Sequence, residues 1–173
     1  MPVLIPDLLY RDDAFHEDLG VEFVWKTETP EWIEGTRIAQ DDPHMIVGTS
    51  DGGAHLDRDD GAEAHTWFLQ HWVREWGGFT LEEGVRQITA IPAALCGLTD
   101  RGQLLVGYAA DIMIFDPETI GPWRKEFVHD LPGGIGRWKA LGTGVKATIV
   151  NGQPIVLDGE ITGRLPGEVV VPS

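Results

Sequence analysis

Apolar positions in the first half of the chain alternate between the spacing of strands and the spacing of helices. Residues 21–25 (VEFVW) and 45–49 (MIVGT) are short, β-branched or apolar runs that predict strands. Between them, Thr29 can cap the free amides of a helix that begins at Pro30 and runs to about Gln40. A strand, a helix and a second strand in this order predict a parallel sheet with a helical crossover.

A second helical pattern follows a loop that is rich in glycine and aspartate. Its apolar stripe has the i, i+3, i+4, i+7 spacing of an amphipathic helix and consists of Leu69, Trp72, Val73 and Trp76. His65 lies one turn before Leu69 on this stripe, which favours a hydrogen-bonded core histidine over a binding residue. Gly77 and Gly78 are expected to end the helix.

Two further helices are predicted before residue 100. Thr80 and Glu83 have the spacing of a capping box, in which each side chain satisfies a backbone amide at the helix start. The buried stripe of that helix is predicted to be Leu81, Val85 and Ile88. Pro92 opens a short last helix that Gly97 ends.

The sequence pattern changes after residue 101, from mostly helical to strand-like and irregular. Residues 111–115 (DIMIF) predict a strand, whereas the glycines and prolines of residues 117–144 predict a mostly irregular segment. Residues 145–150 alternate in the manner of a strand, and Asn151-Gly152 is a strong signal for a hairpin turn.

The pattern continues as an antiparallel meander. The return strand covers residues 154–157, and Pro154 marks it as an edge strand because proline has no amide to donate. Asp158-Gly159 then predicts a second turn into residues 160–162.

Composition narrows the classes of function. The 173 residues include 13 Lys and Arg against 28 Asp and Glu, which gives a formal net charge of −15. Such a surface repels nucleic acids and anionic membranes, and no apolar run has the roughly 18 residues of a membrane span. The first residues lack a basic segment and a cleavage site, so we expect no signal peptide. The single Cys96 fits a reducing compartment, and we expect a cytoplasmic protein.

The loop of residues 48–55 (GTSDGGAH) carries the strongest candidate chemistry. It follows a predicted parallel strand, where α/β folds place their active sites. Asp51 could hold or activate a metal-bound water, or it could simply turn the chain. His55, four residues later, could face the same cavity or share a polar surface.

Other familiar patterns are absent or incomplete. The sequence has no His-x-His, no His-Glu-x-x-His and no cysteine pair, so it does not provide a complete metal site. Residues 57–61 lack the ligands of a calcium loop, and residues 133–136 lack the spacing of a phosphate-binding loop. Ser50 is not in a G-x-S-x-G elbow, which argues against a serine hydrolase.

Two stretches resemble a known family. Residues 97–116 (GLTDRGQLLVGYAADIMIFD) resemble the segment in which amidohydrolase-superfamily enzymes leave their barrel and enter a small β domain. Residues 150–156 (VNGQPIV) and 162–167 (TGRLPG) are similar to the ending of the N-acyl-D-amino-acid deacylase (D-aminoacylase) group. With residues 50–52 upstream, the resemblance covers the chain from about Met45 onward.

This resemblance implies a metal-dependent hydrolase that acts on a carbon–nitrogen bond other than a peptide bond. In the family, a (β/α)8 barrel binds zinc through residues on earlier strands. The residue equivalent to Asp51 takes a proton from the zinc-bound water, with possible contact to the metal, and passes it to the leaving nitrogen. Arg58 could pair with the carboxylate of an acylated amino acid, with His55 as a further substrate-binding residue. Alternatively, Arg58 neutralises its aspartate neighbours in residues 57–60.

The expected fold is therefore α/β and a part of a larger one. A (β/α)8 barrel needs about 200–250 residues. Residues 1–100 are expected to supply its last two β/α units, and residues 101–173 a small antiparallel β domain. Zinc is expected in the complete enzyme, whereas this chain alone is expected to bind none and to be inactive. The loop after Asp51 departs from the His- and Pro-rich loop of the best-known D-aminoacylases, which leaves the substrate open.

Two alternatives to deacylation of N-acyl-D-amino acids stay open. The chain could be a non-catalytic half-barrel and β-domain subunit, or part of a cyclic-amide hydrolase related to hydantoinases and dihydroorotases. Residues 162–167 argue against the cyclic-amide reading. A partial barrel exposes strand edges and apolar faces, so we expect the chain to pair with itself or with the missing N-terminal portion of the barrel.

Overall fold

The computed structural model describes residues 29–40, 42, 44–48, 50, 52 and 62–171. The chain divides into two compact units. The first comprises residues 1–45, 49–64 and 123–141, and the second comprises residues 46–48, 65–122 and 142–173. These units differ from the predicted segments 1–100 and 101–173, whose division stays a prediction. The predicted strand at residues 21–25 lies outside the described residues.

Helix α2 (Pro30–Gln40) of the first unit has the predicted start and end. The Thr29 hydroxyl accepts a hydrogen bond from the amide of Trp32 at 3.2 Å, which satisfies a donor that the first turn leaves free. Pro30 occupies the first helical position, where its missing amide costs nothing. Local sequence signals therefore suffice to place this helix.

Residues 45–48 form no strand, contrary to the prediction for residues 45–49. The amide of Met45 instead donates to the carbonyl of Asp42 at 2.9 Å. A parallel strand requires neighbouring backbone to complete its hydrogen bonds. Within the part of the chain that the structure describes, no strand occurs before residue 112. An apolar run alone thus does not produce a strand here.

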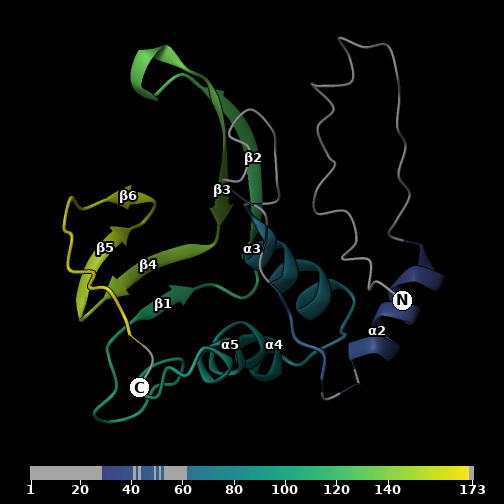
Figure 1. The fold of residues 1–173 in the computed structure, drawn as a ribbon. Coiled ribbons are helices and arrows are strands. Elements are labelled where there is room, and N and C mark those ends of the chain that lie inside the picture. The colour runs from purple at the N-terminus through teal and green to yellow at the C-terminus, as the bar shows by residue number, and fades with distance from the viewer. Residues whose placement is uncertain are drawn as a thin grey trace, which may run out of the picture. The chain divides into compact units, whose positions relative to one another are not determined.

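The segment predicted to be irregular contains two strands, so that prediction was wrong. Strands β2 (Gly121–Val128) and β3 (Arg137–Thr143) pair into a two-stranded sheet, which Figure 1 shows as a long twisted ribbon. The glycines that suggested irregularity gather in the turn Pro132–Gly134 at its tip, where Gly133 and Gly134 have positive φ. A glycine-rich turn between two strands was mistaken for a glycine-rich loop.

Cross-strand contacts fix this ribbon near its tip. The guanidinium of Arg137 donates two hydrogen bonds, 2.7 and 2.8 Å long, to the two carboxylate oxygens of Asp130. The rings of Phe127 and Trp138 meet edge to face with centroids 5.3 Å apart. A bidentate ion pair and an aromatic pair are both favourable cross-strand contacts.

The helix predicted around the tryptophan stripe exists but is not a single α-helix. Helix α3 (Ala64–Phe68) continues into a π-helical segment, η1 (Leu69–Glu75). Within the described residues, its buried side chains are Ala64, Phe68, Leu69 and Trp72. The buried stripe is thus centred on Ala64, Phe68 and Trp72, which places His65 at its margin. His65 is exposed, so its predicted place in the core was wrong.

Helices α4 (Leu81–Ile88) and α5 (Ala90–Leu95) follow. The Thr80 hydroxyl accepts from the amide of Glu83 at 3.2 Å, which confirms half of the predicted capping box. The carboxylate of Glu83 instead accepts hydrogen bonds from Arg86 and Gln87, which also lie within reach on the helix. Gly97 has φ +69° directly after the last helix, as expected for a terminating glycine.

Packing between α4 and η1 depends on a glycine rather than on the predicted apolar stripe. Leu81 is 37% exposed, whereas Gly84 is buried. A side chain at Gly84 would overlap Val73 and would reach the ring of Phe68 at 3.7 Å. The absence of a side chain therefore allows the two helices to approach closely.

The meander prediction was correct. Strands β1 (Ile112–Phe115), β4 (Val145–Val150), β5 (Gln153–Leu157) and β6 (Glu160–Ile161) form an antiparallel sheet in the order β1-β4-β5-β6. Asn151 and Gly152 have φ of 46° and 73°, and Asp158 and Gly159 have φ of 48° and 85°. Positive φ at both central residues is the geometry that tight hairpins require.

One detail of this sheet differs from the prediction. Strand β5 is not an edge strand, because β6 pairs with it through Val156 and Leu157. Pro154 lies just beyond that pairing, and its carbonyl accepts a hydrogen bond from the Thr162 hydroxyl at 2.7 Å. Proline is tolerated there because β6 is too short to require an amide at that position.

In the second unit, buried side chains and hydrogen bonds connect the helices with the residues just before β2. Leu69 and Ile120 are each 1% exposed. One nitrogen of the Arg74 guanidinium donates to the carbonyls of Pro117 and Ile120 at 3.0 and 2.6 Å. None of the helices in the described residues has the length and apolarity needed to span a bilayer.

Candidate functional site

The three predicted site residues, Asp51, His55 and Arg58, lie outside the described residues. The structure does describe the residues on either side of Asp51 in the sequence. The Ser50 hydroxyl accepts a hydrogen bond from the amide of Gly52 at 3.2 Å. Ser50 therefore acts as a local turn residue.

Gly52 lies close to Ala62, ten residues later in the chain. A Cβ at this position would lie 2.9 Å from the Cα of Ala62 and 3.0 Å from its Cβ. Such distances are too short for any residue larger than glycine without movement of the backbone. We refer to this approach as the Gly52–Ala62 contact.

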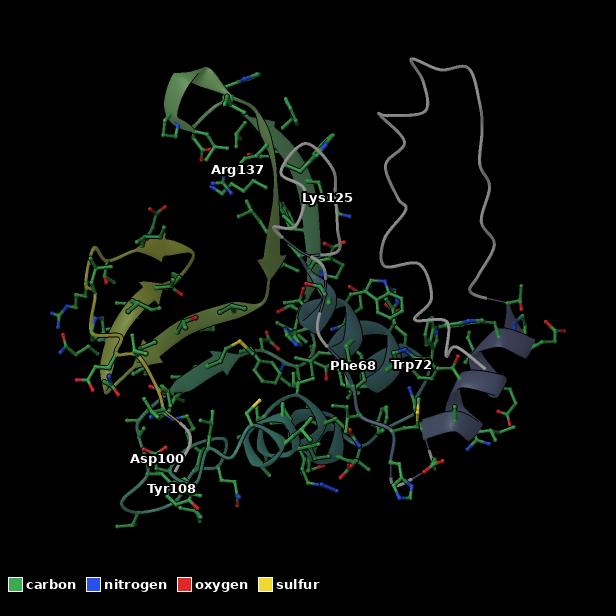
Figure 2. All side chains as sticks on the ribbon, viewed as in Figure 1. Phe68, Trp72, Asp100, Tyr108, Lys125 and Arg137 are labelled. Atoms are coloured by element: carbon green, nitrogen blue, oxygen red, sulfur yellow. The ribbon has the colours of Figure 1, made fainter. Side chains whose placement is uncertain are left out.

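The residue after Ala62 forms an ion pair with strand β2. Glu63 Oε1 lies 2.7 Å from Lys125 Nζ, and the two side chains are only 8% and 20% exposed. Figure 2 shows Lys125 on the β2–β3 ribbon. The sequence did not suggest this pair, because nothing local connects two charged residues that lie so far apart along the chain.

A second cluster of polar and aromatic side chains lies on η1. His71 Nδ1 and Glu75 Oε2 are 2.7 Å apart, and Trp67 and Trp76 contact the His71 ring with centroids 4.5 and 5.3 Å away. Partial burial acts to raise the pKa of Glu75, but hydrogen bonds from Gln70 and His71 outweigh it and hold that pKa below its ordinary value. The i, i+4 spacing is that of a pair that stabilises its own helix.

A surface cavity of about 460 Å³ surrounds Arg101. Arg101 pairs with Asp100 at 3.0 Å and with Asp111 at 2.7 Å, and Asp111 also accepts from the amide of Asn151 at 2.9 Å. The hydrogen bond from Arg101 lowers the pKa of Asp100. The cavity's polar groups thus bind one another and join the residue 97–116 motif to the β4–β5 turn, which is a structural role.

The described residues do not provide a zinc site. In that part of the chain, no three His, Cys, Asp or Glu side chains lie together as metal ligands. A tetrahedral zinc site needs at least three such protein ligands.

Most of the chain is similar to one family of known proteins. Residues 13–156 match the model of a family described as "Amidohydrolase family". This match covers most of the chain and includes the loop around Asp51. The chain belongs to the amidohydrolase family. The resemblance inferred from residues 97–116 and 150–167 is thereby confirmed.

Similar proteins include a D-aminoacylase, an N-acyl-D-aspartate deacylase and an allantoinase of Streptomyces avermitilis, the last 34% identical over 94 residues, which cover 51% of this chain and 21% of the relative. A D-aminoacylase of Alcaligenes xylosoxydans xylosoxydans is 34% identical over 139 residues, which cover 78% of this chain and 26% of the relative. An N-acyl-D-aspartate deacylase from the same organism is 36% identical over 106 residues, which cover 61% of this chain and 19% of the relative. The chain thus spans about a quarter or less of these relatives' length.

One solved structure is similar to part of the chain. It is an N-acyl-D-glutamate deacylase from Bordetella bronchiseptica in complex with zinc and a phosphonate inhibitor. It is 29% identical with a TM-score of 0.47, and the similarity covers 64% of this chain and 22% of that one.

Proposed function

We propose that this amidohydrolase chain is part of an enzyme that hydrolyses the linear amide of an N-acyl-D-amino acid. The observation that carries the proposal is the family match over residues 13–156, which spans the loop around Asp51. The 34% identity to a D-aminoacylase over 78% of the chain supports the substrate class.

Asp51 is the proposed proton-transfer residue. Its carboxylate accepts a proton from the water that attacks the amide carbonyl, and then delivers that proton to the leaving nitrogen. A carbon–oxygen bond forms and the carbon–nitrogen bond breaks, so the products are a carboxylate and a free amino acid. A positioned carboxylate of this kind contributes about 10²–10⁴-fold in rate.

Zinc belongs to the complete enzyme in this proposal. When bound, zinc would lower the pKa of a water ligand to about 7, and residues other than those the structure describes would supply its ligands. Residues 1–100 belong to the barrel and residues 101–173 to the β domain, with Arg58 and His55 toward the substrate. We further propose that the enzyme is cytoplasmic and that its partial barrel is completed by another portion of the barrel or by a second copy.

Replacement of Asp51 by asparagine tests the function directly. Asp51→Asn keeps the size of the side chain but removes the proton acceptor, so kcat for an N-acyl-D-amino acid should fall about 10²–10⁴-fold with KM little changed. The matched control is Asp158→Asn, because Asp158 is exposed in a turn where asparagine is equally tolerated. Steady-state kinetics of the metal-loaded enzyme that contains this chain provide the measurement.

The alternatives predict different results. An Asp51→Asn enzyme that keeps most of its kcat would remove the catalytic assignment. Turnover of a cyclic amide in place of the linear one would favour the hydantoinase-like reading. A metal-loaded enzyme that hydrolyses neither substrate would favour a non-catalytic subunit.

A further inference from the structure

Glu63, which forms an ion pair with Lys125, comes shortly after the loop around Asp51 in the sequence. Glu63 directly follows Ala62, the residue that Gly52 touches. Its carboxylate is 2.7 Å from Lys125 Nζ, and its side chain is 8% exposed. An ion pair this sheltered is screened by salt less than a surface pair is.

Strand β2 provides a firm anchor for the pair. Lys125 lies between Trp123 and Phe127 along the strand, and β2 is paired with β3. The Asp130–Arg137 fork and the Phe127–Trp138 contact join the two strands further along the ribbon. The position of Glu63 is therefore set by a paired sheet and not by the loop alone.

The Gly52–Ala62 contact carries this constraint from Ala62 back to Gly52. The backbones of the two residues approach closely, and the Ser50 hydroxyl fixes the Gly52 amide at 3.2 Å. A continuous series of contacts and covalent bonds thus links Lys125 through Glu63 and Ala62 to Gly52. Gly52 directly follows Asp51 in the sequence.

We infer that Glu63 and Lys125 are positioning residues, which hold the Gly52–Ala62 contact closed and so fix the backbone beside Asp51. The catalytic consequence rests on the proposed function, whereas the structural consequence does not. Displacement of a reacting group by about 1 Å can cost on the order of 10²-fold in rate.

Amide hydrogen exchange of the whole chain tests the structural consequence. Lys125→Met removes the charge at similar length, and exchange in the peptide that contains Ser50, Gly52 and Ala62 should become about tenfold faster. Lys125→Arg keeps the charge and should restore the slow exchange. The matched control is Lys146→Met, an exposed lysine on β4, which should leave this peptide unchanged.

Kinetics of the metal-loaded enzyme test the catalytic consequence. Lys125→Met should lower kcat about 10- to 100-fold with KM changed by less than about twofold, and Lys125→Arg should recover most of it. If Lys125→Met does not fold, Glu63→Asp keeps both charges but shortens the carboxylate arm, and should give smaller changes in the same direction.

Two results would overturn the inference. Folded Lys125→Met and Glu63→Asp with unaltered exchange at Ser50, Gly52 and Ala62 would show that the pair stabilises the ribbon alone. Faster exchange at these residues with unaltered kcat, in an enzyme that Asp51→Asn inactivates, would show that the contact does not position the catalytic loop. An enzyme in which Asp51→Asn has no effect would refute the proposed function and leave the exchange result to decide on the contact.

Discussion

Substitution of Arg58 distinguishes between the two roles predicted for its side chain. If it pairs with the substrate carboxylate, Arg58→Ala removes a bidentate, charge-assisted contact that is present both before and during the reaction. KM should then rise about 10- to 100-fold with kcat nearly intact, in contrast to Asp51→Asn. Steady-state kinetics on an N-acyl-D-amino acid measure both constants.

The control for this prediction is another exposed arginine. Arg86 on α4 pairs with Glu83 at 3.0 Å, with its side chain 54% exposed. Arg86→Ala should leave both kinetic constants unchanged. Equal kinetics for Arg58→Ala and Arg86→Ala would favour the reading in which Arg58 only neutralises neighbouring aspartates.

Two helical glycines predict opposite effects of one substitution. Gly84→Ala would overlap Val73, and should lower the free energy of unfolding by about 1–2 kcal/mol even after the gain in helix propensity. Gly35 on α2 has open space at its Cβ, so Gly35→Ala should raise that free energy by about 0.5–1 kcal/mol. Urea unfolding followed by circular dichroism compares the two, and equal effects would contradict the close approach of α4 to η1.

Residues whose signals are local were predicted correctly, and residues that depend on distant partners were not. Thr29 and Thr80 cap helices because their hydroxyls reach amides three residues away. Glu63 and Lys125 gave no signal, because their pairing depends on how β2 is placed. Asp51 was singled out from its position after an apolar run, and its role remains a prediction.

The same distinction holds for whole elements. The β4–β5 hairpin follows from Asn151-Gly152, since these residues specify a turn without help from the rest of the chain. Strands β2 and β3 were missed because the three charged residues 124–126 interrupt the apolar pattern between Trp123 and Phe127. Their pairing joins segments that flank a turn at Pro132–Gly134, whose composition is also typical of loops. Residues 45–48 show the converse error, in which a strand-like pattern has no partner strand in the described residues.

The β2–β3 ribbon predicts a pH-dependent contribution to stability. Hydrogen bonds from Arg137 hold the pKa of Asp130 below its ordinary value. The unfolded chain therefore binds more protons, so this contribution is fully present above the ordinary carboxyl pKa and is lost as pH falls through the lowered one. Arg137→Gln should return the pKa of Asp130 toward its ordinary value, which a carbon-13 NMR titration of the carboxyl measures.

A distant ion pair serves as the control for that titration. Arg86→Gln changes a pair on α4 and should leave the titration of Asp130 as it is. An Asp130 titration that is the same with and without Arg137 would contradict the bidentate contact.

At the scale of the whole molecule, the chain corresponds to 26% of a D-aminoacylase, and its described residues bring no set of zinc ligands together. We therefore expect the isolated chain to bind zinc weakly and to show no deacylase activity. Metal analysis after dialysis against a chelator measures this directly. Near-stoichiometric zinc that resists the chelator would contradict the prediction.

The family was accessible from the sequence because residues 97–116 and 150–167 form short, distinctive motifs. The barrel was not accessible in the same way, because each of its strands requires neighbours that close a ring. A closed barrel of that kind requires a longer chain than the residues that the structure describes.

The π-helical segment η1 has a consequence for the tolerated length of the chain. Each i→i+5 turn holds one residue more than an α-helical turn, as in the bond from the Trp76 amide to the His71 carbonyl. Deletion of one residue before Val73 would let the segment return to α-helical bonding. Because an α-helical turn holds one residue fewer, Val73 would keep nearly the same direction relative to Phe68, and with it its place against Gly84. A single deletion in this segment should therefore be tolerated better than one in an ordinary α-helix, where it would turn every later side chain by about 100°.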